Sequence, residues 1–577
     1  MAQMRYPAEQ MHRIRYTKLS GPQIDARLRS AVDGPSSDSP LSDALAGEQM
    51  RILTDGGPEL RYRFTSQNRL SVQENGAAAV DAGYGALTLD QVVFFSHVIP
   101  GTQRAYHVIV DRDTRLATVF EVWFSGGQDL DNREVQRQAY FGYVQQPGQA
   151  APEKRHRITN RVEGKGYFWR QDNGIETLEF FPSTISSNFV ELTRFGGELS
   201  FCAPTDYIQI NDKLYIYQRT ECEFSGTQTI YVFDVNRIEQ VGARLGFNER
   251  DELEYYVFRG TGEWLGQIAH FEEFGNIGAP DPNAPPAEKG ARRVYRPMRT
   301  FQTFTREEFD RIAADNEPRV FPPATGTGGM AGNKQEVSGY LVGKELTIRY
   351  DRGPVIEYRF DAIQSLRWRK EGQRNWIEAR YEAWESAPDL VMFGHLLAGE
   401  PDHDSHMVVA DFRHGLASCL HGTMGTPYIG NEAAVENLFG VIEMEGMTPP
   451  KYRRHQFTDE LVGKCLTWNY SPGLTSMHLY ATPHSLSWII FGPDGAGGME
   501  WSGPAAYVKI RDGIYLGYWL EEACNGTLGT ILINMRTMHD VGIGYHCSKD
   551  GVRLNAMGAH ARHAGRFDIN RFYDIAT

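Results

Sequence analysis

Cysteine and long apolar runs are both scarce in this chain. Six cysteines are spread over 577 residues without a Cys-x-x-Cys pair, which argues against a disulfide framework and a thiolate metal site. No stretch approaches the roughly 20 apolar residues of a membrane-spanning helix, and the first residues lack the apolar core of a secretion signal. Glycine-rich phosphate loops, dinucleotide fingerprints, nucleophile elbows and zinc-ligand spacings are missing as well. We expect a soluble, cytoplasmic protein without a cofactor, and the missing motifs disfavour hydride and phosphoryl transfer.

Positive charge is the minority sign. Lys and Arg total 59 against 73 Asp and Glu, so the net charge is -14 and the isoelectric point is near 5.7. This average field repels polyanions, so we expect neither nucleic acid nor a membrane as a partner. Hydrophobic residues make up 41% and charged residues 23%, which is ordinary globular composition. At about 150 residues per domain, the length predicts roughly three to five domains.

Helical patterns are few, and most of the sequence alternates between apolar and polar positions. Between residues 345 and 397 the runs "ELTIRYD", "VIEYRFD", "SLRWRK", "WIEARYEAW" and "LVMFGHLL" follow one another. This spacing indicates an antiparallel barrel or sandwich. Two segments favour helices: Thr305 to Asn316, which opens with a capping box, and Asn431 to Gly440, which has an Asn cap and a terminal Gly. We predict an all-β fold with few short helices.

An internal duplication is the clearest pattern in the sequence. "DGGPELRYRF", from Asp55, matches "DRGPVIEYRF", from Asp351, and later segments match in the same order with few gaps. The matches pair His97 with His395, Glu121 with His421, Trp169 with Trp468, Tyr215 with Tyr515 and Glu221 with Glu521. A weaker repeat within each half, "LVGKELTIRYDRG" and "LVGKCLTWNYSPG", divides it again. The chain is thus predicted to hold four β modules in the order A, B, A′, B′.

The module boundaries follow from composition and from the repeat. Each module has roughly 110 to 130 residues, which suits a closed barrel of seven or eight strands without exposed edges. The Pro- and Gly-rich segment between the halves reads as a linker with a short helix. The predicted parts are a flexible arm at 1–40, barrel A at 41–155, barrel B at 156–275, the linker at 276–336, barrel A′ at 337–450 and barrel B′ at 451–577.

Each half resembles the molybdenum cofactor biosynthesis protein F (MoaF) family. The resemblance rests on the Gly-Lys strand openings at Lys344 and Lys464, on "FGHLLAG…HMVVADFRHGLASCLHG" and on "YLGYWLEEACNGTLGTILINMRTMHDVG". It implies two lipocalin-like (calycin) barrels in the carboxyl-terminal half and a diverged second copy in the amino-terminal half. The family name implies a role with a pterin phosphate. The resemblance supplies no catalytic residue set.

In module B′, alternation along one strand places Tyr515, Trp519 and Glu521 on a single face. A carboxylate among aromatic rings inside a barrel can act as a general acid or base, and a tyrosine can supply a second proton. We therefore predict Glu521 and Tyr515 as catalytic, with Glu221, Tyr215 and Trp169 as their counterparts in module B. The rings predicted to bind a ligand are Trp468, Tyr470, Trp488 and Trp519. Core packing, and an exposed Glu521, are the alternatives.

Module A′ adds candidate histidines and arginines. Of 17 histidines, 12 follow residue 330, which favours the carboxyl-terminal half as the active one. His395 and His421 are predicted as catalytic and Arg367 and Arg369 as ligand-binding, because imidazole titrates near neutrality and guanidinium holds oxyanions. His97 is the counterpart in module A. Satisfied barrel histidines are the alternative, and the segment "PDHDSH" is weak evidence for a metal, so none is predicted.

These residues predict a cofactor-independent enzyme, a lyase, isomerase or cyclase, that acts on a small aromatic or unsaturated carbonyl compound in a barrel cavity. Two alternatives stay open: a non-catalytic lipocalin-like carrier, and an accessory or assembly factor in molybdopterin biosynthesis. An enzyme needs an inward ionisable pair, whereas a carrier needs only an apolar cavity with one orienting polar group. The expected partner is an aromatic small molecule, and a homodimer is compatible with the sequence.

Overall fold

The computed structural model describes residues 19–573, except at 125–134, 184–185, 194–196, 198, 222–225, 249–251, 269–328, 398–403, 425–432, 472–473, 492–499, 522–526 and 549–550. This part of the chain is almost entirely strand, with a single α-helix, α2 (Gly21–Leu28), and short 3-10 turns η1 (Arg29–Asp33), η3 (Gly329–Ala331) and η5 (Asn570–Phe572). None of its helices is long and apolar enough to cross a membrane. The predicted all-β class is confirmed.

Barrels A and A′ are closed rings of eight antiparallel strands in simple meander order. In each ring the last strand pairs with the first, as at Ile52↔Val144 and Ile348↔Ile442. Barrel A consists of β1 (Gln49–Thr54), β2 (Leu60–Phe64), β3 (Arg69–Glu74), β4 (Val80–Leu89), β5 (Val92–Val98), β6 (Arg104–Asp111), β7 (Leu116–Phe124) and β8 (Val135–Val144). Barrel A′ consists of β18 (Glu345–Tyr350), β19 (Val355–Ala362), β20 (Ser365–Lys370), β21 (Ile377–Ala387), β22 (Leu390–Leu396), β23 (Ser405–Asp411), β24 (Leu416–Met424) and β25 (Ala433–Glu443).

Barrels B and B′ also close on themselves but share one 19-stranded sheet. The closing pairs are β10–β17 and β27–β35. Barrel B consists of β10 (Lys165–Gln171), β11 (Glu176–Phe180), β12 (Ser186–Glu191), β13 (Ser200–Gln209), β14 (Leu214–Glu221), β15 (Thr227–Asp234), β16 (Glu239–Phe247) and β17 (Leu253–Ile268), with β9 (Arg157–Ile158) beside β13. Barrel B′ consists of β27 (Lys464–Ser471), β28 (Leu474–Thr482), β29 (Ser485–Phe491), β30 (Glu500–Arg511), β31 (Ile514–Glu521), β32 (Thr527–Asn534), β33 (His539–Ser548), β34 (Gly551–Met557) and β35 (His560–Phe567), with β26 (Gln456–Phe457) beside β30.

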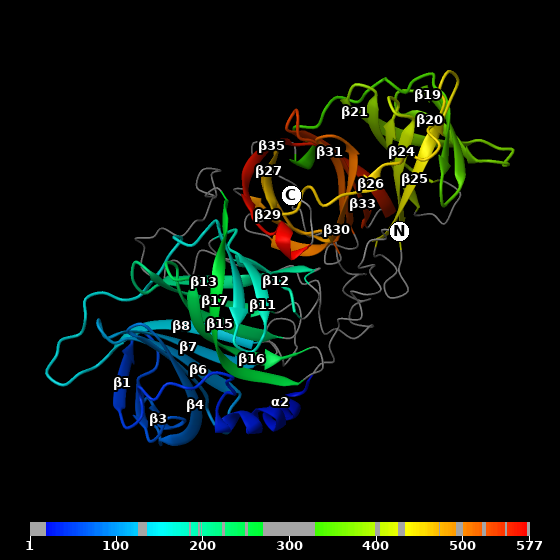
Figure 1. The fold of residues 1–577 in the computed structure, drawn as a ribbon. Helices are drawn as coiled ribbons and strands as arrows, with labels where there is room; N and C mark the ends of the chain where they lie inside the picture. Colours follow the sequence, from blue (N-terminus) through cyan, green and yellow to red (C-terminus); the bar gives the residue numbers. More distant parts are fainter. Residues whose placement is uncertain are drawn as a thin grey trace.

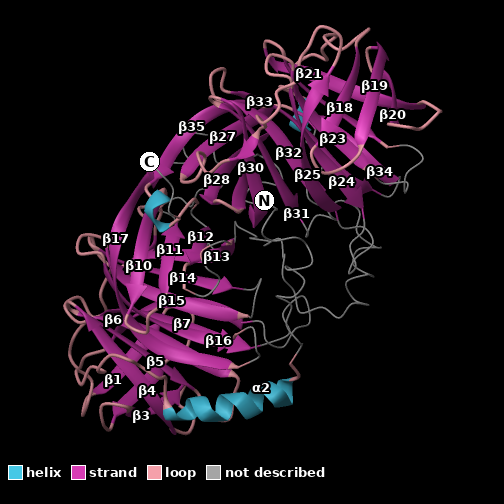
Figure 2. Ribbon diagram, turned by 45° about the vertical axis from the view of Figure 1, so that its right-hand side comes forward, coloured by secondary structure: helices cyan, strands magenta, loops and turns pink. Residues whose placement is uncertain are grey.

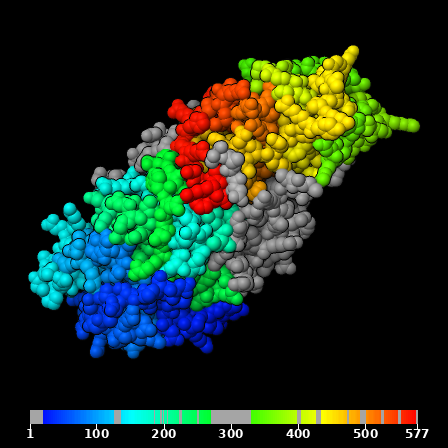
Figure 3. Space-filling model, viewed as in Figure 1, coloured from blue at the N-terminus to red at the C-terminus, as the bar shows by residue number. Residues whose placement is uncertain are grey.

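The four barrels form an elongated row in the spatial order A, B, B′, A′ (Figures 1 and 3). The two B-type barrels therefore meet at the centre, and the A-type barrels lie at the ends (Figure 2). Each A-type barrel packs its outer face on the neighbouring B-type barrel, so one apolar cluster joins Phe94 and Ile109 to Ile230 and Val232, and another joins Met392 to Leu532. This arrangement separates the interiors of the four barrels from one another.

Glycine allows the central seam between barrels B and B′ to form. Three residues of β17 pair with three of β35, with Gly266 opposite Phe567 and Ile268 opposite Gly565. Both glycines have φ of +135°, and a Cβ at either position would lie 2.6–2.7 Å from the backbone of the other strand. Because only glycine accepts both the conformation and the close approach, these two residues fix where the halves join.

Glu500 lies buried beside this seam and gives it a pH dependence. Its side chain accepts a hydrogen bond from Asn188 of the other barrel, and burial raises its pKa to about 8, against the opposing hydrogen bonds from Ser186 and Asn188. A carboxyl whose folded-state pKa is raised stabilises the fold fully below its unfolded value near 4.5, and this stability is lost as the pH rises through about 8.

We expect Glu500→Gln to stabilise the protein by about 2–4 kcal/mol at pH 9 and to have little effect near pH 4.5, because the amide mimics the protonated acid. Thermal unfolding of both proteins across this pH range measures the difference. A gap between the two melting temperatures that is the same at pH 4.5 and pH 9 would contradict the assignment.

Two local predictions differ from the structure. The segment predicted as a helix from Asn431 to Gly440 is strand β25 from Ala433 onward, because pairing with β18 and β24 closes barrel A′ and outweighs the local cap signals. Part of the predicted flexible arm is packed: Ile24 and Leu28 of α2 are buried in the cluster under barrel A. The helix predicted from Thr305 to Asn316 lies outside the described residues.

Candidate functional site

A cavity opens at one end of barrel B′, where β31 ends and β32 begins. It measures about 40 Å³, which is room for about three waters or one small polar head group. The lining combines aromatic rings, two methionines, a carboxylate and an imidazole: Met330, Tyr470, Leu474, Ser476, His478, Trp488, Ile490, Trp519, Glu521, Thr527, Gly529 and Met557. Methionine side chains adapt easily, so Met330 and Met557 form the part of the wall that can move aside for a ligand.

Glu521 is the buried carboxylate of this cavity. Its Oε1 atom accepts hydrogen bonds from the indole N–H groups of Trp488, at 2.9 Å, and Trp519, at 2.6 Å. The strand pattern explains this, because Trp519 and Glu521 point inward two residues apart on β31. Gly529 on β32 makes the arrangement possible, since a Cβ there would lie 2.4 Å from the Trp519 ring. Two rigid indoles therefore hold the carboxylate in one orientation.

His478 lies in the same lining and is not among the residues predicted from sequence. Its ring centroid is 5.4 Å from that of Trp519 and 5.9 Å from that of Trp468. Burial lowers its pKa to about 3, so the imidazole is neutral near pH 7. Among the described residues its Nδ1 atom has no hydrogen-bond partner. The signal that could have found it is the alternation of Ser476, His478 and Tyr480 along β28, which places all three on one face.

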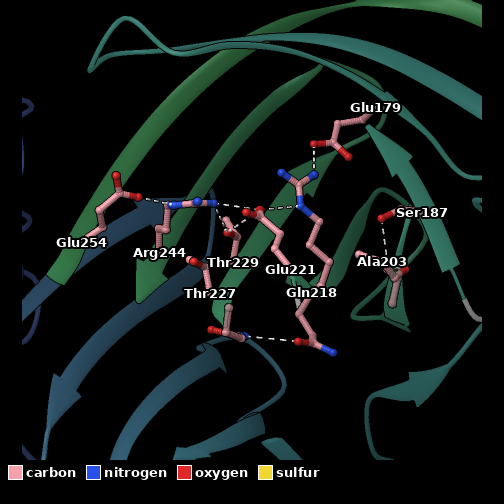
Figure 4. A network of polar contacts seen from close by, with 12 residues as sticks. Glu179, Ser187, Ala203, Gln218, Glu221, Thr227, Thr229, Arg244 and Glu254 are labelled. Carbon is pink, nitrogen blue, oxygen red and sulfur yellow. Dashed lines mark hydrogen bonds and ion pairs between the residues drawn. The ribbon is translucent and has the colours of Figure 1, made fainter. Parts of the chain in front are cut away.

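Barrel B fills the equivalent space with charged side chains of its own. Arg219 donates hydrogen bonds to Glu179 and to Glu221, and Arg244 donates to Glu221 at 2.8 Å and to Glu254 at 2.7 Å. The result is a line of alternating charges through the barrel interior, in which Glu179, Glu221, Arg244 and Glu254 can be followed in Figure 4. The Arg219 guanidinium also lies 3.6 Å above the Phe189 ring.

Burial and ion pairing oppose each other at the two carboxyl groups beside Arg219. Burial by itself raises the pKa of Glu221, but the nearby Arg244 and Arg219 outweigh it and lower the pKa to about 2. For Glu179 burial prevails over Arg219 and raises the pKa to about 7. Glu221 therefore contributes stability above pH 4.5 that is lost as the pH falls toward 2. Removal of one charged side chain from this network would leave its partner buried without a counter-charge, so the stability of each ion pair depends on the others.

The strand registers align the two B-type barrels position by position. Both have a Ser–Pro pair (Ser186↔Pro204, Ser485↔Pro504) followed by an aromatic pair (Phe189↔Phe201, Trp488↔Trp501). On this alignment the equivalent residues are Arg219 and Trp519, Arg244 and Gly544, Glu179 and His478, Thr229 and Gly529, Phe189 and Trp488, and Glu221 and Glu521. Barrel B′ therefore keeps the carboxylate, as Glu521. It has neither arginine of barrel B, because Trp519 replaces Arg219 and Gly544 replaces Arg244.

Three histidines form a row across the interior of barrel A′. His395, His406 and His421 lie directly opposite one another on β22, β23 and β24, with ring centroids 5.7 Å and 5.3 Å apart. The Tyr358 hydroxyl lies 3.0 Å from His406 Nδ1 and 3.4 Å from His395 Nε2, and His421 Nε2 lies 3.1 Å from an Asp404 oxygen. Burial lowers the pKa of His395 to about 4. The row is a line of three imidazoles that ends at a carboxylate, and burial also lowers the pKa of His406.

This histidine row is specific to barrel A′. The equivalent positions of barrel A hold His97, Tyr106 and Glu121, with Glu121 bound by Arg104 at 2.7 Å. Within the described part of the chain, no group of three or more His, Cys, Asp or Glu is placed to hold a metal ion. His403 of the "PDHDSH" segment lies outside that part.

Comparison with known proteins matches both barrels of the carboxyl-terminal half. Residues 324–426 match the model of the MoaF N-terminal domain, and residues 455–566 match that of the MoaF C-terminal domain. Protein MoaF of Klebsiella aerogenes is 28% identical over 214 residues, which are 34% of this chain and 77% of that protein. The carboxyl-terminal half belongs to the MoaF family. Barrel A′ corresponds to the MoaF N-terminal domain and barrel B′ to the MoaF C-terminal domain.

The four residues predicted as catalytic fall in three places of the MoaF half. Glu521 lines the cavity of the MoaF C-terminal domain. Tyr515 lies at the opposite end of the same strand, where its hydroxyl donates to Glu460 at 2.6 Å. His395 and His421 belong to the MoaF N-terminal domain, in a separate barrel interior. These four residues do not form one site. Alternation along a strand shows which residues lie on the same face, but it does not show at which end of the strand each residue lies.

The residues predicted to bind a ligand divide in the same way. Tyr470, Trp488 and Trp519 line the cavity of the MoaF C-terminal domain, and Trp468 lies behind His478. Arg367 and Arg369 were predicted to hold a ligand but point out of their barrel, because Leu366 and Trp368 take the inward positions of the strand. Arg367 pairs with Asp361 and Arg369 with Glu357 on the surface.

The counterparts in the amino-terminal half contact side chains or backbone of their own barrels. Glu221 belongs to the charged network, and Trp169 stacks on Tyr167. The Tyr215 hydroxyl lies 3.4 Å from the Asp212 carbonyl oxygen. His97 lies 3.1 Å from the Tyr62 hydroxyl, as His395 lies near Tyr358 in the MoaF N-terminal domain. Glu521, Tyr470, Trp488 and Trp519 are the predicted residues that line the cavity described above.

Proposed function

We propose that barrel B′ is the receptor for a planar head group with guanidine-like N–H donors, and that the chain serves as a binding or accessory protein for a pterin in molybdenum cofactor biosynthesis. The observation that carries the proposal is the pair of B-type barrels. Barrel B places the guanidinium of its own Arg219 between an aromatic ring and two carboxylates, whereas barrel B′ keeps the aromatic position and one carboxylate and has a cavity.

The substitutions between the two barrels favour a ligand in B′. Arg244 is replaced by Gly544, where a Cβ would meet only the flexible end of Met557 at 3.2 Å and one backbone oxygen at 3.9 Å. Thr229 is replaced by Gly529, which admits the Trp519 ring. These changes remove a long charged side chain and add an indole wall. A barrel interior under selection for stability alone would be filled, because close packing is the usual state of a protein core.

A pterin suits the chemistry of this wall. Its pyrimidinone edge carries a 2-amino group next to a ring N–H, and these donors suit a carboxylate such as Glu521, whose Oε1 atom already accepts from two indoles. Its flat ring system can stack on Trp488 or Trp519, which line the cavity, but the cavity as it stands admits only the donor edge, so Met330 and Met557 must move aside for the rest of the ring. The family name implies a pterin phosphate as well, so the ligand chemistry and the family resemblance agree.

A catalytic role for the same cavity is the second candidate. Glu521 and the neutral His478 both line it, so a bound carbonyl compound would meet a proton acceptor and a proton donor together. This pair supports the lyase or isomerase reaction. Binding and catalysis are separable by His478→Gln: a carrier keeps its affinity within about threefold and shows no turnover in either form, whereas an enzyme loses turnover.

Calorimetric titration of the whole protein with pterin and with lumazine tests the binding proposal. Lumazine has a carbonyl oxygen where pterin has the amino group. This oxygen is a hydrogen-bond acceptor, so it cannot donate to the Glu521 carboxylate. We expect pterin to bind with a Kd of about micromolar order and lumazine to bind at least 30-fold more weakly, a difference of about 2 kcal/mol.

Two variants with the same change of charge make this test specific. Glu521→Gln is expected to weaken pterin binding by about 30-fold or more, since the carboxylate accepts charge-assisted hydrogen bonds from the pterin donors and an amide does so more weakly. Glu445→Gln, on the surface of barrel A′, is expected to have no effect. Equal affinity for pterin and lumazine, or no heat of binding at millimolar pterin, would refute the proposal.

A further inference from the structure

A second recess lies between barrels A′ and B′, at the end of B′ remote from Glu521. It has a volume of about 710 Å³, within the usual range of about 300–1,000 Å³ for small-molecule sites. Its walls come from the turns that join β21 to β22 and β23 to β24 in A′, from the segment before β26, and from the turns after β30 and β32 in B′. We call this recess the basic cleft.

Positive charge dominates the basic cleft. Six of its lining residues are Arg or Lys and a single one is acidic, Asp512, although the whole chain carries a net charge of -14. The cationic residues are Arg413, Arg453, Arg454, Lys509, Arg511 and Arg536. Carboxylates paired with Arg454, Lys509 and Arg511 offset part of this charge. The remaining excess of cations lines a concave wall, which concentrates the electrostatic potential, so the cleft attracts anions even though the average surface repels them.

The amino-terminal half lacks this concentration of charge. The His156 contact to Thr118 repeats the His455 contact to Ser418, each at 2.8 Å, and so aligns the two clefts. At the aligned positions the amino-terminal half has four cationic residues (Lys154, Arg155, Arg157 and Arg237) and three acidic ones (Asp90, Asp113 and Asp212). Arg413, Lys509, Arg511 and Arg536 replace Asp113, Gln209, Asn211 and Asn236. The charge is therefore not a by-product of the shared fold.

Arg511 gives the cleft a fixed wall. From barrel B′ it reaches into A′, where it donates two hydrogen bonds to the buried carboxylate of Asp411, at 2.7 and 3.1 Å, and others to the carbonyl oxygens of Pro388 and Asp389. The same carboxylate accepts from His414 Nδ1 at 2.8 Å. Because one carboxylate holds groups from both barrels, their relative position at the cleft is set before any ligand arrives.

Other cations of the cleft remain available to a ligand. Arg453 and Arg536 are exposed, and within the described part of the chain neither makes an ion pair. Arg413 has its nearest carboxylate, Asp389, at 4.0 Å. The Tyr452 ring beside them is 85% exposed and lines the same space. These groups offer bidentate guanidinium contacts to an oxyanion and an aromatic face to an attached ring.

We infer that the basic cleft binds a small phosphorylated molecule. A phosphate group accepts several charge-assisted hydrogen bonds at once, and arginine is the residue that best matches its geometry. A small ligand inside the cleft experiences the local positive charge, whereas a long polyanion would also lie along the acidic remainder of the surface. The concave shape and the volume fit a small molecule better than a protein partner.

The basic cleft is a different site from the Glu521 cavity. The cleft lies at the Ile514 end of β31 and the cavity at the Glu521 end. Eight residues of strand separate them by roughly 23 Å, more than a single pterin phosphate spans. The inference therefore does not depend on the proposed pterin site and can fail or succeed independently of it.

Calorimetric titration of the full chain with pyrophosphate tests this inference, with malonate as a non-phosphate dianion and a phosphoserine peptide as a protein-like source of phosphate. We expect pyrophosphate to bind at least tenfold more tightly than malonate or the peptide. Arg453→Gln combined with Arg536→Gln should weaken pyrophosphate binding about 30-fold or more, because each arginine contributes charge-assisted hydrogen bonds. Arg374→Gln, which removes one exposed charge from the β20–β21 turn outside the cleft, should leave it unchanged.

Three results would overturn the inference: no binding of pyrophosphate at millimolar concentration, undiminished binding by the double variant, or tighter binding of the phosphopeptide. The Glu521→Gln variant tests whether the cleft is independent of the Glu521 cavity. We expect it to bind pyrophosphate with unchanged affinity. If that variant loses pterin binding but not pyrophosphate binding, the two sites are separate. If pyrophosphate binding is lost in Glu521→Gln, a separate cleft site is excluded.

Discussion

Exchanging three residues of barrel B′ for those of barrel B is expected to abolish pterin binding while the fold is kept. The exchange is Trp519→Arg, Gly529→Thr and His478→Glu together. It replaces a lining imidazole and indole by the charged pair that fills barrel B, so the introduced guanidinium occupies the place proposed for the ligand. We expect at least 100-fold weaker binding of pterin, about 2.7 kcal/mol or more, measured by calorimetry.

The three changes are designed to be made together for a steric reason. Gly529→Thr alone places a Cβ 2.4 Å from the Trp519 ring and is expected to destabilise barrel B′, whereas with Trp519→Arg the ring is gone. Circular dichroism and thermal unfolding of the triple variant check that it folds. If a folded triple variant binds pterin as tightly as the unmodified protein, the Arg219 guanidinium of barrel B does not occupy the position that a ligand takes in barrel B′.

Removing Arg219 is expected to destabilise barrel B strongly. Arg219→Met leaves Glu179 and Glu221 in a dry interior without the guanidinium between them, and breaking a buried ion pair in this way costs about 3–5 kcal/mol. Urea unfolding measures this loss. The matched change in the other barrel, Trp519→Met, leaves Glu521 its hydrogen bond from Trp488 and should cost less in the same assay.

The pH dependence of the Arg219→Met variant has a defined sign. Glu179 already has a pKa raised to about 7 by burial, and without the arginine this carboxyl takes up a proton still more readily. The variant should therefore lose less stability at pH 5, where the carboxyl is protonated, than at pH 8. An equal loss at both pH values, or a loss below about 1 kcal/mol, would contradict a mutually dependent charged network.

Sequence periodicity predicted the architecture because closed barrels repeat one simple rule. Alternating runs bounded by Gly, Asn and Asp predict meander strands, and the match of Asp55 with Asp351 predicts the duplication. The spatial order A, B, B′, A′ was not predictable, since it depends on the β17–β35 seam, in which Gly266 and Gly565 approach strands of the other half. The error from Asn431 to Gly440 arose because cap residues are a local signal, whereas ring closure is not.

The candidate site was predictable in part. Inward alternation correctly grouped Trp519 with Glu521, but it could not tell that Tyr515 lies at the opposite end of the barrel, because period alone carries no information on depth. The comparison of the two halves did not point to His478, because the equivalent residue in barrel B is Glu179 and not a histidine. The network around Arg219 was also missed: it depends on residues of four strands that only the closed barrel brings together.

Barrel B places its own charged side chains where barrel B′ is proposed to receive a ligand. The most direct measurement is a crystal structure of the full chain grown with excess pterin. We predict density for a flat ring among Trp488, Trp519 and Tyr470, with its amino edge on Glu521, and none inside barrel B. Pterin density within barrel B, or an unoccupied B′ cavity at saturating pterin, would contradict it.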